Sequence, residues 1–262
     1  MRFSIALMNL SKENITVVLQ GPIDDRTFEA IDSYNDQGFG EVICSTWNDE
    51  NIDLLAPSDN QSFKLVTSKY PDMTGINNDG CRFFVAITAG VGCHHASKDF
   101  VLKVRTDEFY PDLSKFIENW QKFPHRAHTT NNGFWKFVPF NFSNHMYLCK
   151  KEILFQACSS IIHHSSGKIL KNLDFTSSEQ ATGYFLMLAM GHDLEKSDWR
   201  KVFSENVFIT PCSDLPGHLH SGQTFTNFKF KRVPDYPNNR KDSSVLKHCT
   251  ESIFNHHKEF LL

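Results

Sequence analysis

The stretch ITVVLQGP, residues 15–22, decides the class of the fold. It begins with a continuous run of β-branched and aliphatic residues, which is typical of a strand that is buried on both faces. The run ends at Gly21 and Pro22, and apolar side chains then recur at helical spacing from Phe28 to Tyr34. A buried strand followed by an amphipathic helix predicts the first unit of an α/β fold.

The same pattern continues through the first 110 residues of the chain. Further continuous strands are predicted at residues 41–45, 63–66 and 100–104, with a helix over about 77–96. Strands of this kind, separated by helices, indicate a mainly parallel sheet with helices on both faces. In such sheets ligands bind beyond the carboxyl ends of the strands.

The second half of the chain is less regular. The spacing predicts helices over about 113–120, 150–164 and 176–191, and strands at 134–138, 145–149 and 206–210. From Ser213 onward glycine, proline, histidine and asparagine are frequent, which is typical of a loop-rich segment. We therefore predict one domain over residues 1–212, with a C-terminal tail, 213–262, packed on it.

Composition excludes several classes of protein. The 262 residues include 27 basic and 30 acidic side chains, and the resulting net charge of −3 disfavours a nucleic-acid partner. The seven cysteines are an odd number without Cys-x-x-Cys spacing, which indicates free thiols in a reducing compartment. The apolar start of the chain is too short for a signal peptide, and no run reaches the ~18 residues of a membrane span. These features favour a cytoplasmic protein.

Polar residues gather at the ends of the predicted strands. They are Gln20, Gly21, Pro22, Thr46, Lys103, Arg105 and Asp107, together with Arg82, which lies one turn into the helix before the fourth strand. A nucleotide-sugar donor has a diphosphate whose charge grows as the sugar leaves, so a glycosyltransferase must supply positive charge there. Arginine and lysine supply it directly, and Asp107 or Glu108 can hold a divalent cation such as Mn²⁺ or Mg²⁺. Each residue also has an ordinary structural explanation, so the hypothesis of a donor site rests on their convergence.

Several short motifs, taken in order, resemble those of the WavE lipopolysaccharide-synthesis family. They are QGP (20–22), STW (45–47), VLKVRTD (101–107), SNH (143–145) and SEQ (178–180), within a similarity that runs from about residue 15 to 210. The resemblance implies a GT-A-like, Rossmann-like glycosyltransferase that moves a sugar from a nucleotide-sugar donor to a bacterial lipopolysaccharide or capsule acceptor, lipid-linked or oligosaccharide. Asn144 stands where the resemblance leads us to expect aspartate. Arg105 stands where many such folds have the first aspartate of Asp-x-Asp.

An inverting transfer needs a base that takes the proton of the acceptor hydroxyl. We predict Glu179 as this base, because it begins a helix after the irregular middle region and matches the glutamate of the family motif. Asp174 is the second candidate for the base, and His145 is the third. Glu179 also fits the third position of a capping box begun by Thr176, which would stabilise the helix by about 0.3–1 kcal/mol. Acceptor binding is a third role for it.

Two features of the tail have competing interpretations. His218 and His220 lie in a glycine-flanked segment that can close over the donor and bring His220 to a metal beside Asp107, although an ordinary loop histidine is the preferred interpretation. Residues 229–241 carry five basic side chains and one aspartate. This segment is either a peripheral contact with anionic lipid of the inner membrane or a solvated tail.

Two other functions stay open. A sugar nucleotidyltransferase shares the architecture, but it ordinarily has a glycine-rich basic loop after the first strand, whereas QGPIDDR (20–26) has one glycine and two aspartates. A non-catalytic glycan-binding protein derived from a transferase is the second alternative, favoured by Asn144 and by the incomplete Asp-x-Asp motif.

Overall fold

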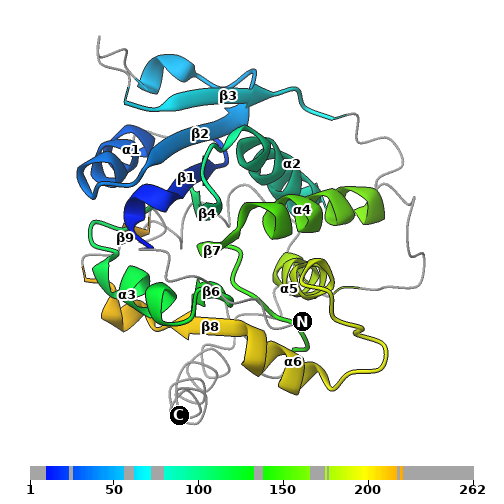
Figure 1. The fold of residues 1–262 in the computed structure, drawn as a ribbon. Helices are drawn as coiled ribbons and strands as arrows, with labels where there is room; N and C mark the ends of the chain where they lie inside the picture. Colours follow the sequence, from blue (N-terminus) through cyan, green and yellow to red (C-terminus); the bar gives the residue numbers. More distant parts are fainter. Residues whose placement is uncertain are drawn as a thin grey trace, which may run out of the picture.

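Seven strands form the central sheet of the protein (Figure 1). From one edge to the other they are β3 (Lys64–Ser68), β2 (Glu41–Trp47), β1 (Ile15–Gln20), β4 (Phe100–Arg105), β7 (Tyr147–Lys150), β6 (Ala127–Thr130) and β8 (Val207–Thr210). Only β7 runs antiparallel to its neighbours in this sheet. The predicted α/β class and mainly parallel sheet are therefore confirmed.

The computed structural model describes residues 10–23, 26–55, 62–71, 80–132, 138–165, 175, 177–216 and 219–220. The predicted strand at 134–138 falls almost wholly outside these residues, as do the basic segment 229–241 and most of the predicted tail. None of the described helices combines the length and hydropathy of a membrane-spanning helix.

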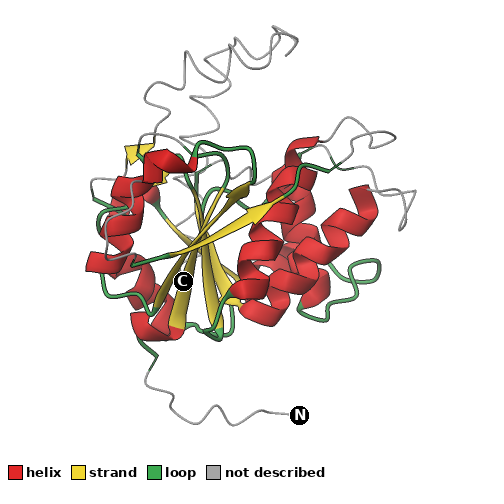
Figure 2. Ribbon diagram, turned by 90° about the horizontal axis from the view of Figure 1, so that it is seen from above, coloured by secondary structure: helices red, strands yellow, loops and turns green. Residues whose placement is uncertain are grey.

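Helices cover both faces of the sheet, as the edge-on view shows (Figure 2). They are α1 (Thr27–Asp36), α2 (Gly80–His95), α3 (Ser114–Lys122), α4 (Lys151–Ser165), α5 (Ser178–Ala189) and α6 (Trp199–Asn206). Short 3₁₀ helices are η1 (Lys12–Asn14), η2 (Ile52–Leu55) and η3 (Cys212–Asp214), and a second sheet pairs β5 (Glu108–Phe109) with β9 (Leu219–His220).

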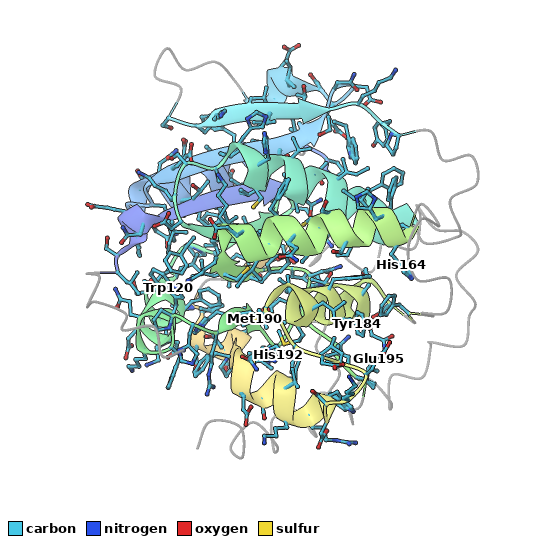
Figure 3. All side chains as sticks on the ribbon, turned by 45° about the vertical axis from the view of Figure 1, so that its right-hand side comes forward. Trp120, His164, Tyr184, Met190, His192 and Glu195 are labelled. Carbon is cyan, nitrogen blue, oxygen red and sulfur yellow. The ribbon has the colours of Figure 1, made fainter. Side chains whose placement is uncertain are left out.

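The apolar run in β1 is continuous because the strand separates two hydrophobic cores. Ile15, Val17 and Leu19 belong to the core under α1 and α3, which contains the fully buried Trp120 (Figure 3). Val18 belongs to the core under α2, α4, α5 and α6. Every residue of β1 is buried, so neither face of the strand needs polar positions. This burial holds the carboxyl end of β1 firmly in the middle of the sheet.

The five cysteines whose side chains are described, Cys44, Cys93, Cys149, Cys158 and Cys212, are free, as the sequence predicted, and the first four are buried. Burial raises the pKa of the Cys44 and Cys93 thiols to about 12, and it raises the pKa of Cys149 and Cys158 as well. Because the thiolate is the reactive form, these four thiols should be inert in the native protein.

We expect iodoacetamide at pH 8 to leave Cys44, Cys93, Cys149 and Cys158 unmodified in the native state and to alkylate all four in urea. Peptide mass spectrometry after quenching measures this. Rapid native alkylation of any of the four would show that the helix covering it opens readily.

Candidate functional site

The parallel strands bring their carboxyl ends to one edge of the sheet. The chain leaves β1 through α1 to reach β2 on one side, and it returns through α2 to β4 on the other side. Ligands commonly bind in a crevice at the point where the strand order of a parallel sheet reverses in this way. At this point Gln20 of β1 and Arg105 of β4 are partners in the strand register. The structure therefore brings together two of the residues predicted from the sequence.

The loop after β1 is hydrogen-bonded to β2 and to the loop after β4. The Gly21 amide donates to the Ser45 carbonyl at 3.3 Å, and the Thr106 hydroxyl donates to the Pro22 carbonyl at 2.6 Å. Gly21 has φ +135°, and a Cβ there would lie 2.8 Å from Oγ1 of Thr106. Glycine is therefore required at this position by backbone conformation and by space.

We expect Gly21→Ala to destabilise the protein by about 1–3 kcal/mol, because alanine must adopt a strained φ and displace Thr106. Urea unfolding measures the change. Gly38→Ala is the matched control: Gly38 also has positive φ, +77°, but no atom lies within 4 Å of its Cβ position. Equal losses in the two variants would show that the contact with Thr106 is unimportant.

Arg105 and Asp107 form an ion pair just beyond β4. Nε of Arg105 donates to Oδ1 of Asp107 at 2.6 Å, and Nη2 of the same guanidinium is paired with Oδ2. The two side chains are 25% and 29% exposed, so the pair is partly in contact with solvent. The pair places a cation and a carboxylate at the carboxyl end of β4, where an incoming anion can exchange for the carboxylate.

Three buried polar atoms at neighbouring strand ends have no hydrogen-bond partner. They are Oε1 of Gln20, Oγ1 of Thr46 and Oγ of Ser68, at the ends of β1, β2 and β3. An unpaired buried polar group costs about 1–3 kcal/mol, and a bound water or ligand is a common reason for one. Alternation along the strands puts Gln20 and Ser68 on the α2 face with Val18 and Thr46 on the other face, so Thr46 does not line the same side.

An aromatic cluster lies on the α2 face between β2 and β3. Trp47 stacks on Tyr70 with ring centroids 4.4 Å apart, and Phe84 of α2 meets Trp47 edge-on at 5.5 Å. Tyr70 is 42% exposed, so the stack reaches the surface. A planar base or a sugar ring can pack on such a surface.

Lys103 lies in β4, two residues before Arg105. It is fully buried, its ammonium donates to the carbonyl of Asn144, and it lies 5.3 Å from the centroid of the Tyr147 ring. Burial, together with repulsion from Arg105, lowers the pKa of Lys103 to about 7. Lys103 therefore supports the segment around Asn144, and its contact with phosphate stays a prediction.

Glu108 is held in a buried network that the sequence did not reveal. One carboxylate oxygen is paired with Nδ1 of His145, and the other accepts the Tyr110 hydroxyl at 2.8 Å. Glu108 and His145 are 2% and 6% exposed. Both oxygens are engaged by protein groups, so Glu108 is a poorer metal ligand than the sequence suggested. The alternation of side chains after β4 was the available signal that Glu108 faces the opposite way from Asp107. Only the folded chain brings His145 next to Glu108.

The N-terminus of α5 lies at the same edge, and it corrects the predicted capping box. The N-cap is Ser177, whose hydroxyl accepts from the Gln180 amide at 3.1 Å. The prediction of Thr176 was wrong by one residue because threonine and serine cap almost equally well. Glu179 is therefore not the capping-box residue, and its carboxylate accepts instead from the Ser178 hydroxyl at 3.1 Å.

The remaining predicted residues are placed only in part. Asp174 lies outside the described residues, and Arg82 is in the first turn of α2, where its side chain is not described. Pairing of β5 with β9 sets the backbone of His220 opposite Glu108, one residue after Asp107. Residues 219–220 thus lie beside β5, and a contact of His220 with a metal stays a prediction.

A divalent cation needs oxygen or nitrogen ligands from the protein or its substrate. No group of three or more His, Cys, Asp or Glu side chains able to hold a metal occurs within the described part of the chain. Mg²⁺-like ions, however, are commonly held by one or two protein groups and by substrate phosphate oxygens. Asp107 offers a carboxylate for a site of that kind, and the backbone of His220 lies on the strand paired with Glu108.

The sequence matches no protein-family model and no curated protein. Among solved structures, the chain is similar to the mannosyltransferase PcManGT from Pyrobaculum calidifontis in complex with GDP-Man and Mn²⁺, at 12% identity and TM-score 0.45 over 76% of this chain and 55% of that one.

Two other solved structures are similar to the chain. The 4-diphosphocytidyl-2C-methyl-D-erythritol synthase from Anaerococcus prevotii has 11% identity and TM-score 0.45, over 75% of this chain and 86% of that one. HddC from Yersinia pseudotuberculosis has 13% identity and TM-score 0.37, over 54% and 78%. Similarity at this level says nothing of activity, which has to come from the chemistry of the site.

Proposed function

We propose that the protein is a GT-A-like glycosyltransferase that transfers a sugar from a nucleotide-sugar donor. The observation that supports this most strongly is the Arg105–Asp107 pair at the end of β4, next to Gln20 of β1. A cation held at the reversal point of a parallel sheet suits the diphosphate of such a donor. The resemblance to the WavE family supports a lipopolysaccharide or capsule acceptor.

Donor binding would use groups that already lie at this edge. The diphosphate takes the place of Asp107 as a partner of the Arg105 guanidinium, whose planar fork suits two phosphate oxygens. The base or the sugar packs on the exposed side of the Trp47–Tyr70 stack. Gln20 and Ser68 lie on the same face and gain hydrogen-bond partners from the ligand.

In the reaction, the acceptor hydroxyl attacks the anomeric carbon and the bond from that carbon to the diphosphate breaks. Glu179 takes the proton of the hydroxyl, and Arg105 stabilises the negative charge that develops on the departing diphosphate. A divalent cation, when bound, would be held by Asp107 and His220 and would add positive charge at that diphosphate. Hydrogen bonds connect Glu179 through Ser178 to Asn144, whose carbonyl accepts from Lys103 of β4.

A panel of nucleotide sugars, each with and without Mn²⁺, tests the proposal through slow hydrolysis in the absence of acceptor. Release of the nucleoside diphosphate is the expected result. Formation of pyrophosphate from a nucleoside triphosphate and a sugar phosphate would identify a nucleotidyltransferase. Retained glycan binding without turnover of any donor would identify a binding protein.

A further inference from the structure

We infer that Asn144 is a positioning residue that orients the carboxylate of Glu179 through the hydroxyl of Ser178. The inference rests on the proposed function, because Glu179 matters as a base only in a transferase. The amide Nδ2 of Asn144 donates to Oγ of Ser178 at 2.9 Å, and that hydroxyl donates to Oε2 of Glu179 at 3.1 Å. The three side chains form a relay from the segment before β7 to the start of α5.

The donor and acceptor in each of these two hydrogen bonds follow from the number of hydrogens that each group can donate. A serine hydroxyl has one hydrogen, and an ionised carboxylate can only accept. Because Ser178 gives its hydrogen to Glu179, it must accept from residue 144, and an amide nitrogen is able to donate there. Aspartate at position 144 is also an acceptor, so it would compete with Glu179 for the same hydrogen.

The relay starts from a firmly held residue. Asn144 is 5% exposed, and its carbonyl accepts the ammonium of the buried Lys103. Two residues earlier, the amide of Phe142 donates to the Glu179 carbonyl at 3.1 Å. The segment is therefore bonded both to β4 and to the first turn of α5, so a shift of Asn144 would be passed to Glu179.

Close packing fixes the same segment against α5. A Cβ on Gly183 would overlap the carbonyl oxygen of Phe140, so only glycine allows this approach. Phe140 itself has φ +56°, a left-handed conformation that is unfavourable for a phenylalanine. Such strain persists only where surrounding contacts hold it, and it is frequent near functional sites. The sequence departure at Asn144 thus has a structural role in placing the proposed base.

The test compares Asn144→Asp and Ser178→Ala with wild type in steady-state transfer, after donor turnover by wild type has been established. We expect kcat to fall about 10- to 100-fold in each variant, since small misplacement of a reacting group has effects of this size, while the donor KM stays within about twofold. Ser178→Thr keeps the hydroxyl and should restore most of kcat. Asn35→Asp is the matched control, because Asn35 makes the same amide-to-serine bond, to Ser62 at 2.7 Å, on the exposed end of α1.

The double variant decides whether the residues act through one another. In the S178A background, N144D should lower kcat by less than about twofold further, because the relay is already broken. Equal losses from N144D in both backgrounds, or kcat of N144D and S178A within twofold of wild type, would overturn the relay and leave the proposed function standing. If N144D melts below the assay temperature, the kcat and KM of S178A and S178T decide alone. Failure of wild type to turn over any donor would overturn both proposals.

Discussion

Asp107→Asn should reduce sugar transfer about hundredfold or more while the protein stays folded. The substitution keeps the size of the side chain but removes the charge that orients the Arg105 guanidinium, and it removes the proposed oxygen ligand of the cation. The two side chains of the ion pair are 25% and 29% exposed, and partly exposed pairs contribute only about 0–1 kcal/mol to stability. The melting temperature should therefore change by a few degrees at most, while kcat/KM measured with a saturating acceptor collapses.

Asp193→Asn is the control for this variant. Asp193 makes an ion pair with Lys196 at 3.1 Å on the surface between α5 and α6, so it loses the same kind of charge at a site without a proposed role. Its kcat/KM should equal that of wild type. Near-normal turnover by D107N would show that Asp107 neither orients Arg105 nor holds a cation, and Arg105 alone would remain to stabilise the leaving group.

Lys103→Met should change how the stability of the protein depends on pH. The folded-state pKa of Lys103 is about 7, against 10.5 for the free side chain. Between these values the unfolded chain binds more protons than the folded chain, so the contribution of Lys103 to stability rises with pH. The rise can reach about 1.4 kcal/mol per pH unit, or about 2 kcal/mol between pH 7 and 9. Methionine is similar in length and does not titrate.

Urea unfolding of both proteins at pH 7, 8 and 9 measures this effect as a difference. The buried thiols are common to both proteins, so their own contribution cancels. The free energy of unfolding of wild type, relative to K103M, should increase over the range. Lys151→Met is the control: Lys151 also donates to a backbone carbonyl, that of Ala96, but it stays partly in contact with water. If the free energies of unfolding of wild type and K103M differ by the same amount at all three pH values, folding does not change the protonation of Lys103 in this range.

Most of the sheet could be predicted from the sequence because burial on both faces removes the need for alternation. The runs at β1, β2 and β4 are apolar for this reason, and their positions agree with the structure to within two residues. The helix α6 was missed, although Asp198 caps it by accepting from the Arg200 amide. An eight-residue helix gives too few turns for a clear apolar period.

The site was predictable only where it follows a strand directly. Gln20 and Arg105 were found because neighbouring parallel strands end together. Glu108, by contrast, was predicted as an oxygen ligand for a cation, and its pairing with His145 joins residues 37 positions apart. Such pairing depends on the antiparallel return of β7 beside β4, which no local pattern specifies. No local pattern specifies the hydrogen bond from Lys103 to the carbonyl of Asn144 either.

A crystal structure of the full chain with a bound nucleoside diphosphate tests the central claim most directly. We expect the diphosphate oxygens about 2.7–2.9 Å from the Arg105 guanidinium, in the crevice between the ends of β1 and β4. A nucleotide bound at another part of the molecule, with the Arg105–Asp107 pair unchanged and remote from it, would contradict the account.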